Sequence, residues 1–211
     1  MTRSAEWHHC GEDNRHLSRG VSSAGVSSAL FATPSLAEPI YHAPMTADEI
    51  KQLLGLAPHP CEGGWFVQTW RSEEVIPQSA LPERYPSARH AGTCIYYLLE
   101  PETFSEMHRL TSDEIFHFYC GDPVEMLQIA PDGSAKRVVL GSDLAAGQHV
   151  QLVVPKSVWQ GSRLVAGGSV ALLGCSVSPG FEYADYETGR REALLDFSGD
   201  YQDLLTALTR G

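Results

Sequence analysis

Short hydrophobic runs, separated by polar turn residues, dominate the chain from residue 62 onward. This spacing is typical of strands rather than of long amphipathic helices. Pro131-Asp-Gly-Ser134 is a hairpin-turn sequence, because Asp-Gly tolerates the positive φ that such turns need. The pattern predicts strands at 64–70, 92–99, 104–108, 114–119, 124–130, 136–140, 149–154 and 169–177. Eight short strands without helical crossovers predict an all-β antiparallel sandwich or barrel.

Two short helices are predicted to flank these strands. Thr46 and Glu49 have the spacing of a capping box, and Gly55 can end the helix in a left-handed conformation, which predicts a helix over 46–54. A stripe of leucines near the C-terminus repeats at helical spacing and predicts a second helix over 198–209.

The first 44 residues differ from the rest of the chain. They are rich in serine, alanine and glycine and have no sustained hydrophobic period. No continuous apolar stretch follows the early basic residue, as a secretory signal would require. We therefore expect a disordered N-terminal extension over 1–44, followed by one domain over 45–211.

Composition narrows the range of partners. The 211 residues include 26 acids and 15 bases, giving a formal net charge of −11 at pH 7. Such acidity disfavours phosphate backbones and anionic lipids, so we expect neither nucleic acid nor membrane partners. The five cysteines are odd in number and contain no C-x-x-C pair. They predict free thiols in a reducing compartment, and hence a cytoplasmic protein.

The segment around His108 carries the most informative pattern. His108, Glu114 and Gly121 occur at the spacing of the motif G-x5-H-x-H-x3-4-E-x6-G, with Leu110 at the position of the second histidine. At these residues the sequence resembles the cupin superfamily.

A second cupin motif, P-x-G-x2-H, resembles the stretch that begins at Pro155. Ser157 replaces its glycine and Gln160 replaces its histidine. Two further stretches that resemble a cupin-like subfamily without a settled function lie at 58–66 and 179–187. The resemblance spans about 46–190. It implies a double-stranded β-helix (a jelly-roll barrel) with short flanking helices, a small-molecule ligand cavity inside the barrel and a homodimer.

Strand periodicity places candidate acid–base chemistry on one face. Glu114, Phe116 and Phe118 share that face because side chains alternate along a strand. A carboxyl group that points into an apolar interior has a raised pKa, which suits acid–base work near neutral pH beside His108. The alternative is that Glu114 simply pairs with a basic residue of the barrel.

The metal ligands of a cupin, three histidines and a glutamate, are incomplete here. Leu110 cannot bind a metal, and Gln160 is a weak neutral donor. His117 lies on the opposite strand face from Glu114. We therefore expect no metal cofactor; weak binding of a divalent ion by His108, Glu114 and Gln160 is the alternative.

Several other side chains are candidates for the pocket wall. Arg71 could bind an anionic ligand or lie at the rim. Tyr97 could take the place of Tyr96, depending on strand parity. His59 and His90 lie in proline-rich loop surroundings, where we expect exposed histidines. The candidate substrate-binding residues are Gln160, Tyr96, Phe116, Phe118, Trp159, Arg71 and Glu62.

The resemblance also suggests a reaction class. Metal-free cupins include epimerases that act on nucleotide-linked sugars and abstract a proton next to a carbonyl group. By analogy we expect an isomerase or epimerase of a carbonyl-bearing, sugar-like compound that uses His108 and Glu114. Two alternatives stay open: a module that binds a small polar ligand without turnover, and a metal-dependent enzyme.

Overall fold

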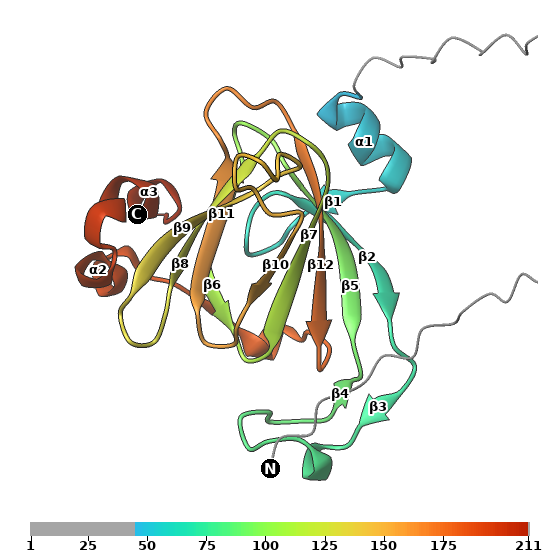
Figure 1. The fold of residues 1–211 in the computed structure, drawn as a ribbon. Helices are drawn as coiled ribbons and strands as arrows, with labels where there is room; N and C mark the ends of the chain where they lie inside the picture. The colour runs from blue at the N-terminus through green and yellow to red at the C-terminus, as the bar shows by residue number, and fades with distance from the viewer. Residues whose placement is uncertain (1–44, 211) are drawn as a thin grey trace, which may run out of the picture. The chain divides into compact units, whose positions relative to one another are not determined.

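The computed structural model describes residues 45–210, which form two antiparallel β-sheets that face each other (Figure 1). The extension expected over 1–44 lies outside the described residues. None of the helices within 45–210 is long and apolar enough to cross a membrane.

The larger sheet has six strands. In spatial order they are β1 (Ala57–Pro58), β2 (Trp65–Arg71), β5 (Thr93–Leu99), β12 (Ala171–Ser178), β7 (Asp113–Gly121) and β10 (Gln151–Val154). The second sheet has five strands. Their order is β13 (Tyr186–Thr188), β6 (Phe104–Leu110), β11 (Trp159–Leu164), β8 (Val124–Ile129) and β9 (Ala135–Leu140). Neighbours in space are mostly not neighbours in sequence, which confirms the predicted jelly roll.

A two-stranded extension projects beyond the sheets. It pairs β3 (Val75–Ile76) with β4 (Arg89–His90), and the connection between them contains a 3-10 turn at Gln78–Ala80. The extension lies below the two sheets in Figure 1.

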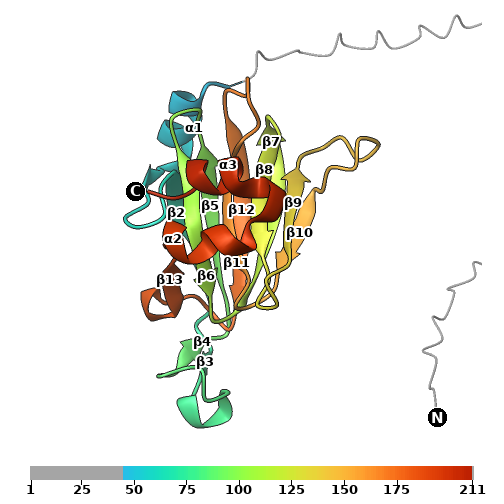
Figure 2. The ribbon, with the colours of Figure 1, turned by 90° about the vertical axis from the view of Figure 1, so that its left-hand side faces the viewer.

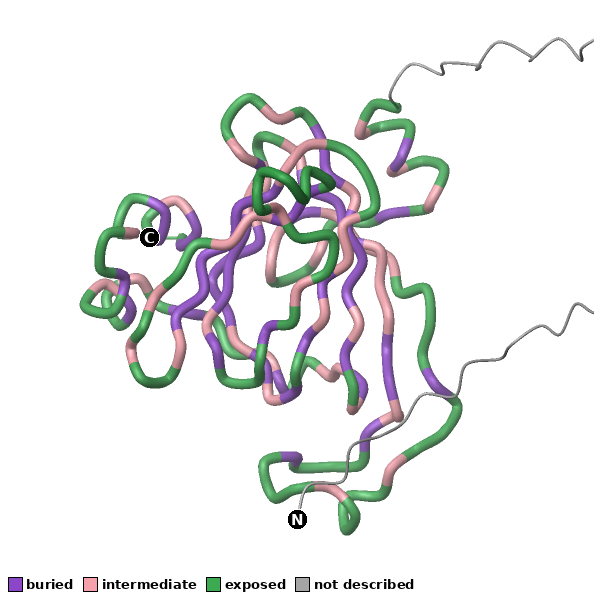
Figure 3. Tube along the Cα trace, in the orientation of Figure 1, coloured by how far each residue is buried: buried purple, intermediate pink, exposed green. Residues whose placement is uncertain are grey.

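Alternation along β7 decides which side chains enter the core. Glu114 and Phe116 are buried, whereas Ile115 and His117 lie on the other face of the strand and are only partly buried. Phe116 joins a core cluster contributed by both sheets, and Figure 3 shows burial concentrated along the strands. The predicted parity of β7 is confirmed.

The N-terminal helix forms as predicted. In α1 (Ala47–Leu54), the Thr46 hydroxyl accepts a hydrogen bond from the Glu49 amide at 3.3 Å, and the Glu49 carboxylate accepts one from the Thr46 amide at 2.8 Å. Gly55 ends the helix at a φ of 66°, a conformation that glycine adopts without steric cost.

The C-terminal helix is shorter than predicted. Residues 198–209 do not form one helix, because Gly199 has a positive φ of 53° and the next residues form a 3-10 turn. Figures 1 and 2 show the C-terminal helices against the second sheet, where Leu205 and Leu208 pack with Met107. The C-terminal elements are α2 (Arg191–Leu194), 3-10 turns at Leu195–Phe197 and Gly199–Tyr201, and α3 (Gln202–Ala207).

Strand β11 is an element that the hydrophobic pattern did not predict. Its sequence, Trp-Gln-Gly-Ser-Arg-Leu, lacks apolar alternation, yet it pairs with a neighbour on each side. Gln160 lies opposite His108 of β6 and Gln128 of β8. This pairing brings the two motif positions His108 and Gln160 together in the centre of the second sheet.

Candidate functional site

A cavity of about 210 Å³ lies between the two sheets. Side chains from both sheets, from the loop before β2 and from the segment after β12 line it. The lining residues are His59, Glu62, Phe66, Gln68, Arg71, Thr93, Ile95, His108, Leu110, Glu114, Cys175, Val177, Phe181, Glu182, Tyr183 and Tyr186.

Glu114 is the buried acid of the cavity, with 7% of its surface exposed. Its Oε2 accepts a hydrogen bond from Gln160 Nε2 at 2.6 Å. Burial raises the pKa of Glu114 to about 7, against the lowering effects of His108 and of the Gln160 and Cys175 hydrogen bonds. The ion pairs that lysines and arginines form within residues 45–210 do not include Glu114, so the ion-pair alternative for Glu114 is not realised.

His108 has a defined tautomer. Its Nδ1 lies 2.7 Å from the Glu106 carbonyl oxygen, which only accepts hydrogen bonds, so the proton is on Nδ1. In the neutral ring Nε2 then carries the lone pair, and this atom lies a long 3.4 Å from the Gln160 amide nitrogen. The imidazole also stacks on Tyr186, with ring centroids 4.9 Å apart. His108 thus keeps a proton on Nδ1, and its Nε2 is the nitrogen that can accept one.

The expectation of an exposed His59 is wrong. Its side chain is only 6% exposed and lines the cavity. The loop between β1 and β2 curls so that the Glu62 amide donates to His59 Nδ1 at 2.9 Å. A proline-rich loop gives no periodic signal of burial, which is why the sequence pattern missed this residue.

Glu62, one of the candidate substrate-binding residues, lines the cavity. Its Oε1 accepts a hydrogen bond from the Ser105 hydroxyl. Gly63 forms the corner at a φ of 99°, and a Cβ there would meet the Phe104 carbonyl oxygen. The phenol of Tyr97, rather than that of Tyr96, reaches this corner and donates to the Gly63 carbonyl at 2.8 Å.

Arg71 lies at the rim of the cavity. Its guanidinium group pairs with the Glu182 carboxylate, and the two side chains are 41% and 37% exposed. The positive charge of Arg71, which was expected to attract an anionic ligand, is therefore neutralised by the Glu182 carboxylate.

Four of the expected pocket residues lie elsewhere, and Gln160 lies behind the lining. Tyr96 belongs to the opposite strand face from Tyr97 and packs edge-on against Tyr119, with ring centroids 5.8 Å apart. Phe116 and Phe118 pack into the core beyond the cavity. Trp159 packs against the C-terminal helices. Gln160 is buried and contacts the cavity through its bonds to Glu114 and His108.

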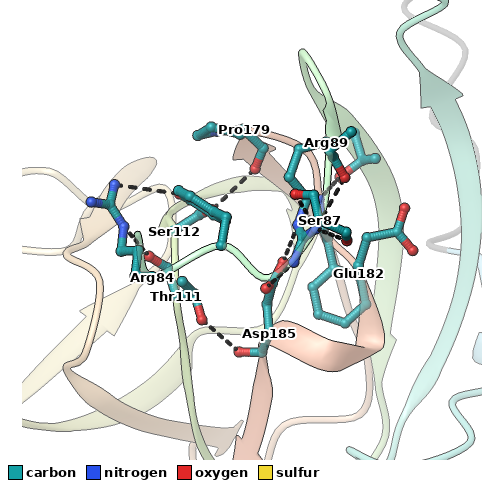
Figure 4. Close-up of polar contacts among 12 residues, drawn as sticks. Arg84, Ser87, Arg89, Thr111, Ser112, Pro179, Glu182 and Asp185 are labelled. Carbon is teal, nitrogen blue, oxygen red and sulfur yellow. Dashed lines mark hydrogen bonds and ion pairs between the residues drawn. The ribbon is translucent and has the colours of Figure 1, made fainter. Parts of the chain in front are cut away.

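The segment after β12 supplies aromatic walls that we assigned no role from sequence. It carries Phe181 and Tyr183, the latter in a 3-10 turn at Tyr183–Asp185, and leads into Tyr186 of β13. A buried ion pair anchors it: Arg89 donates to Asp185 through Nε at 2.9 Å and Nη2 at 2.6 Å (Figure 4). Nη1 of the same guanidinium group also donates to the Ser87 and Ala88 carbonyls, so each of its three nitrogens has a partner.

The donor set does not fit a tightly held metal ion. Gln160 directs an amide N–H at Glu114, and the apolar side chain of Leu110 lines the cavity at another ligand position. Within residues 45–210 no group of three or more His, Cys, Asp or Glu side chains has a metal-binding arrangement. The expected lack of a metal cofactor stays a prediction.

Comparisons with known proteins agree with this architecture. The sequence matches the family described as Cupin superfamily (DUF985) over residues 48–189. It is 27% identical over 175 residues to the uncharacterized protein YML079W of Saccharomyces cerevisiae, covering 79% of this chain and 84% of the yeast protein.

Two solved structures extend this similarity. Protein SO0799 from Shewanella oneidensis is 35% identical, with a TM-score of 0.69, and the match covers 79% of this chain and 99% of that one. A hypothetical protein from Leishmania major is 30% identical, with a TM-score of 0.70, and the match covers 79% and 100%. The similarity extends over most of the described domain.

Proposed function

Because the chain belongs to the cupin superfamily (DUF985), we propose that its cavity binds a small carbonyl-bearing, sugar-like compound and isomerises or epimerises it without a metal ion. One observation carries the proposal. The Gln160 amide nitrogen lies 2.6 Å from Glu114 Oε2 and 3.4 Å from His108 Nε2, so an acid and a base are fixed beside each other. An acid and a base placed in this way can catalyse proton transfer at a carbon next to a carbonyl group.

The reaction needs no oxidant, reductant or cofactor. His108 Nε2 takes the proton from the carbon next to the carbonyl group, and the electron pair of that C–H bond forms a carbon–carbon double bond. The carbonyl oxygen takes the proton of the Glu114 carboxyl group, which gives an enediol. For isomerisation, the neighbouring hydroxyl returns a proton to Glu114 while His108 protonates the former carbonyl carbon. For epimerisation, the enediol turns over in the cavity, and His108 returns the proton to the opposite face of the carbon that lost it, while the former carbonyl oxygen gives its proton back to Glu114.

The protonation states support these roles. Because the pKa of Glu114 is about 7, both its acid and its base forms are populated near neutral pH. The Glu106 carbonyl holds the proton of His108 on Nδ1, and this keeps Nε2 available as the base.

Solvent exchange tests the proposal. The purified protein is incubated in D₂O with dihydroxyacetone, and deuterium at the carbon next to the carbonyl group is measured by NMR. We expect incorporation well above the buffer rate, and a loss of 10²-fold or more, roughly, in His108→Ala and Glu114→Gln. His117→Ala is the matched control, because His117 lies on the other face of β7 and should leave exchange unchanged. Exchange that persists in both cavity variants would refute these roles.

A binding module is the second candidate. The hydroxyl of Tyr186, a residue of the cavity lining, is buried and has no hydrogen-bond partner within the described part of the chain. Such an atom favours a ligand that completes its hydrogen bond. Native mass spectrometry that detects a retained small molecule, together with no deuterium exchange, would favour this function over catalysis.

Assembly and location complete the proposal. We propose a cytoplasmic homodimer, supported by the uncovered edge strands β1 and β10 of the six-stranded sheet. Light scattering at micromolar concentration should give twice the mass of one chain; a monomer would refute the dimer.

A further inference from the structure

His59 is a second imidazole of the cavity, and the backbone fixes its tautomer. The Glu62 amide donates to His59 Nδ1 at 2.9 Å, and the Cys61 amide donates to the same atom at 3.4 Å. Backbone amides only donate, so Nδ1 carries a lone pair and the proton of the neutral ring is on Nε2. The imidazole is therefore a hydrogen-bond donor at Nε2.

Within residues 45–210 this N–H has no hydrogen-bond acceptor, so it can donate to a ligand. Nε2 lies 3.9 Å from Glu62 Oε2, beyond hydrogen-bond distance. The ring packs edge-on against Phe66, with centroids 4.6 Å apart, which holds it in place. Burial lowers the pKa of His59, and the nearby His108 lowers it further against the opposing effect of Glu62, so the donor stays neutral.

The two imidazoles of the cavity have opposite polarity. His59 presents an N–H at Nε2, whereas His108 presents a lone pair at Nε2 because its Nδ1 donates to the Glu106 carbonyl. A bound molecule therefore meets a fixed donor and a fixed acceptor in the same cavity. This suits a carbonyl oxygen next to a carbon that carries an acidic hydrogen.

The charges of the cavity disfavour an anion. Its lining includes the carboxyl groups of Glu62, Glu114 and Glu182 but only one basic side chain of lysine or arginine type, Arg71. Arg71 is already paired with Glu182. A phosphate or carboxylate inside the cavity would face like charges without a free counter-charge.

We propose that the substrate is an uncharged hydroxycarbonyl compound, such as a neutral aldose or ketose, whose carbonyl oxygen accepts a hydrogen bond from His59 Nε2. This inference rests on the isomerase or epimerase proposed above. In the reaction, His59 keeps its proton and stabilises the negative charge that develops on the carbonyl oxygen, while His108 takes the proton from the neighbouring carbon. His59 is then a catalytic residue in addition to His108 and Glu114.

The first test needs no ligand. Long-range ¹H–¹⁵N NMR of the full chain, with histidine labelled in the ring, distinguishes the two tautomers at pH 7. We expect the Nε2–H form for His59 and the Nδ1–H form for His108, assigned by the loss of each signal in His59→Gln and His108→Gln. A His59 ring that is protonated on Nδ1 or doubly protonated at pH 7 would overturn the inference.

The second test compares two ketones that differ in charge. Calorimetry measures the binding of dihydroxyacetone and of dihydroxyacetone phosphate, and we expect the uncharged compound to bind at least tenfold more tightly. His59→Phe keeps a flat ring but loses the N–H, and should weaken dihydroxyacetone binding severalfold and slow its deuterium exchange roughly 10²-fold. His59→Gln places an amide N–H near the same position and should restore part of both.

The outcomes separate this inference from the proposed function. Preferred binding of dihydroxyacetone without any exchange refutes the isomerase while the preference for an uncharged ligand stands. Exchange with tighter binding of the phosphate, or equal effects of His59→Phe and His59→Gln, refutes this inference while the isomerase stands. If neither probe binds, the inference is refuted.

Discussion

Gln160 lies directly opposite His108 in the β11–β6 pairing, and its amide nitrogen donates a hydrogen bond to the Glu114 carboxylate of β7. A side chain in the position of a cupin metal ligand thus acts as a hydrogen-bond donor to another ligand position. This relationship links the second sheet to the six-stranded sheet at the cavity.

Removing the Gln160 amide should raise the pKa of Glu114 above 7, because its hydrogen bond stabilises the ionised carboxylate. Gln160→Met keeps the length of the side chain and deletes the donor. A ¹³C NMR titration of the glutamate carboxyl groups measures the shift. Gln128→Met, a buried change on the neighbouring strand β8, is the matched control and should leave the pKa of Glu114 in place. An unchanged pKa in Gln160→Met would contradict the role of the amide.

Restoring the two missing histidines should create a metal site. The double substitution Leu110→His and Gln160→His adds two ligands to His108 and Glu114, and we expect it to bind zinc or nickel near one ion per chain. The unchanged protein, purified without a His tag or chelator, should hold far less than one ion. Elemental analysis by mass spectrometry measures both. Stoichiometric metal in the unchanged protein would show that Gln160 and Leu110 do not prevent binding.

Glu114 should make stability depend on pH. Burial raises its pKa from an ordinary 4.5 to about 7, so the folded protein holds this proton over a range in which the unfolded chain has lost it. The contribution of Glu114 to the free energy of unfolding is fully present below pH 4.5. It falls as the pH rises from 4.5 to 7 and is lost above pH 7. The total loss is about 3 kcal/mol.

Urea unfolding at pH 5 and pH 8 measures this dependence. Other groups also titrate in this range, so the informative quantity is the difference between the unchanged protein and Glu114→Gln, which carries no titrating group at this position. We expect the unchanged protein to lose about 2.5 kcal/mol more stability than the variant between the two pH values, because part of the total loss already lies below pH 5. Parallel pH profiles would show that Glu114 has no raised pKa.

Much of the fold follows from local pattern, but the site depends on contacts that pattern does not encode. Alternation along β7 correctly separates Glu114 from His117, and the capping box correctly starts α1. The hydrophobic pattern did not predict strand β11, because two of its buried residues, Gln160 and Ser162, are polar. Without apolar residues at these positions, the alternation typical of a strand is missing. Its burial depends on neighbours that lie far away in the sequence.

The same limit applies to the loops that close the cavity. The burial of His59 depends on a curl of the chain that two backbone amides define. Arg89 and Asp185 are 96 residues apart, and nothing in either local sequence indicates their pairing. Motif spacing therefore identified His108 and Glu114, whereas the walls around them required the structure.

Breaking the buried Arg89–Asp185 pair should destabilise the protein strongly. Arg89→Ala leaves the Asp185 carboxylate buried without its partner, at a cost of about 3–5 kcal/mol. The segment that carries Tyr183 and Tyr186 loses its anchor, so ligand binding should weaken as well. Urea unfolding measures the first effect. Glu187→Gln breaks an exposed pair with Arg109 and should cost about 1 kcal/mol or less. Similar losses in the two variants would contradict the structural role of the buried pair.

Freeing the arginine at the rim should change which ligands enter the cavity. In Glu182→Gln, Arg71 loses the acid that neutralises it, and the lining carries one negative charge fewer. We expect dihydroxyacetone phosphate to bind severalfold more tightly than to the unchanged protein, because a free guanidinium group forms paired hydrogen bonds with phosphate. The gain should shrink as salt concentration rises, since an exposed charge is screened, and the further substitution Arg71→Gln should abolish it. Calorimetry at two salt concentrations measures these effects. An unchanged affinity for the phosphate in Glu182→Gln would show that the ion pair at the rim does not control access by anions.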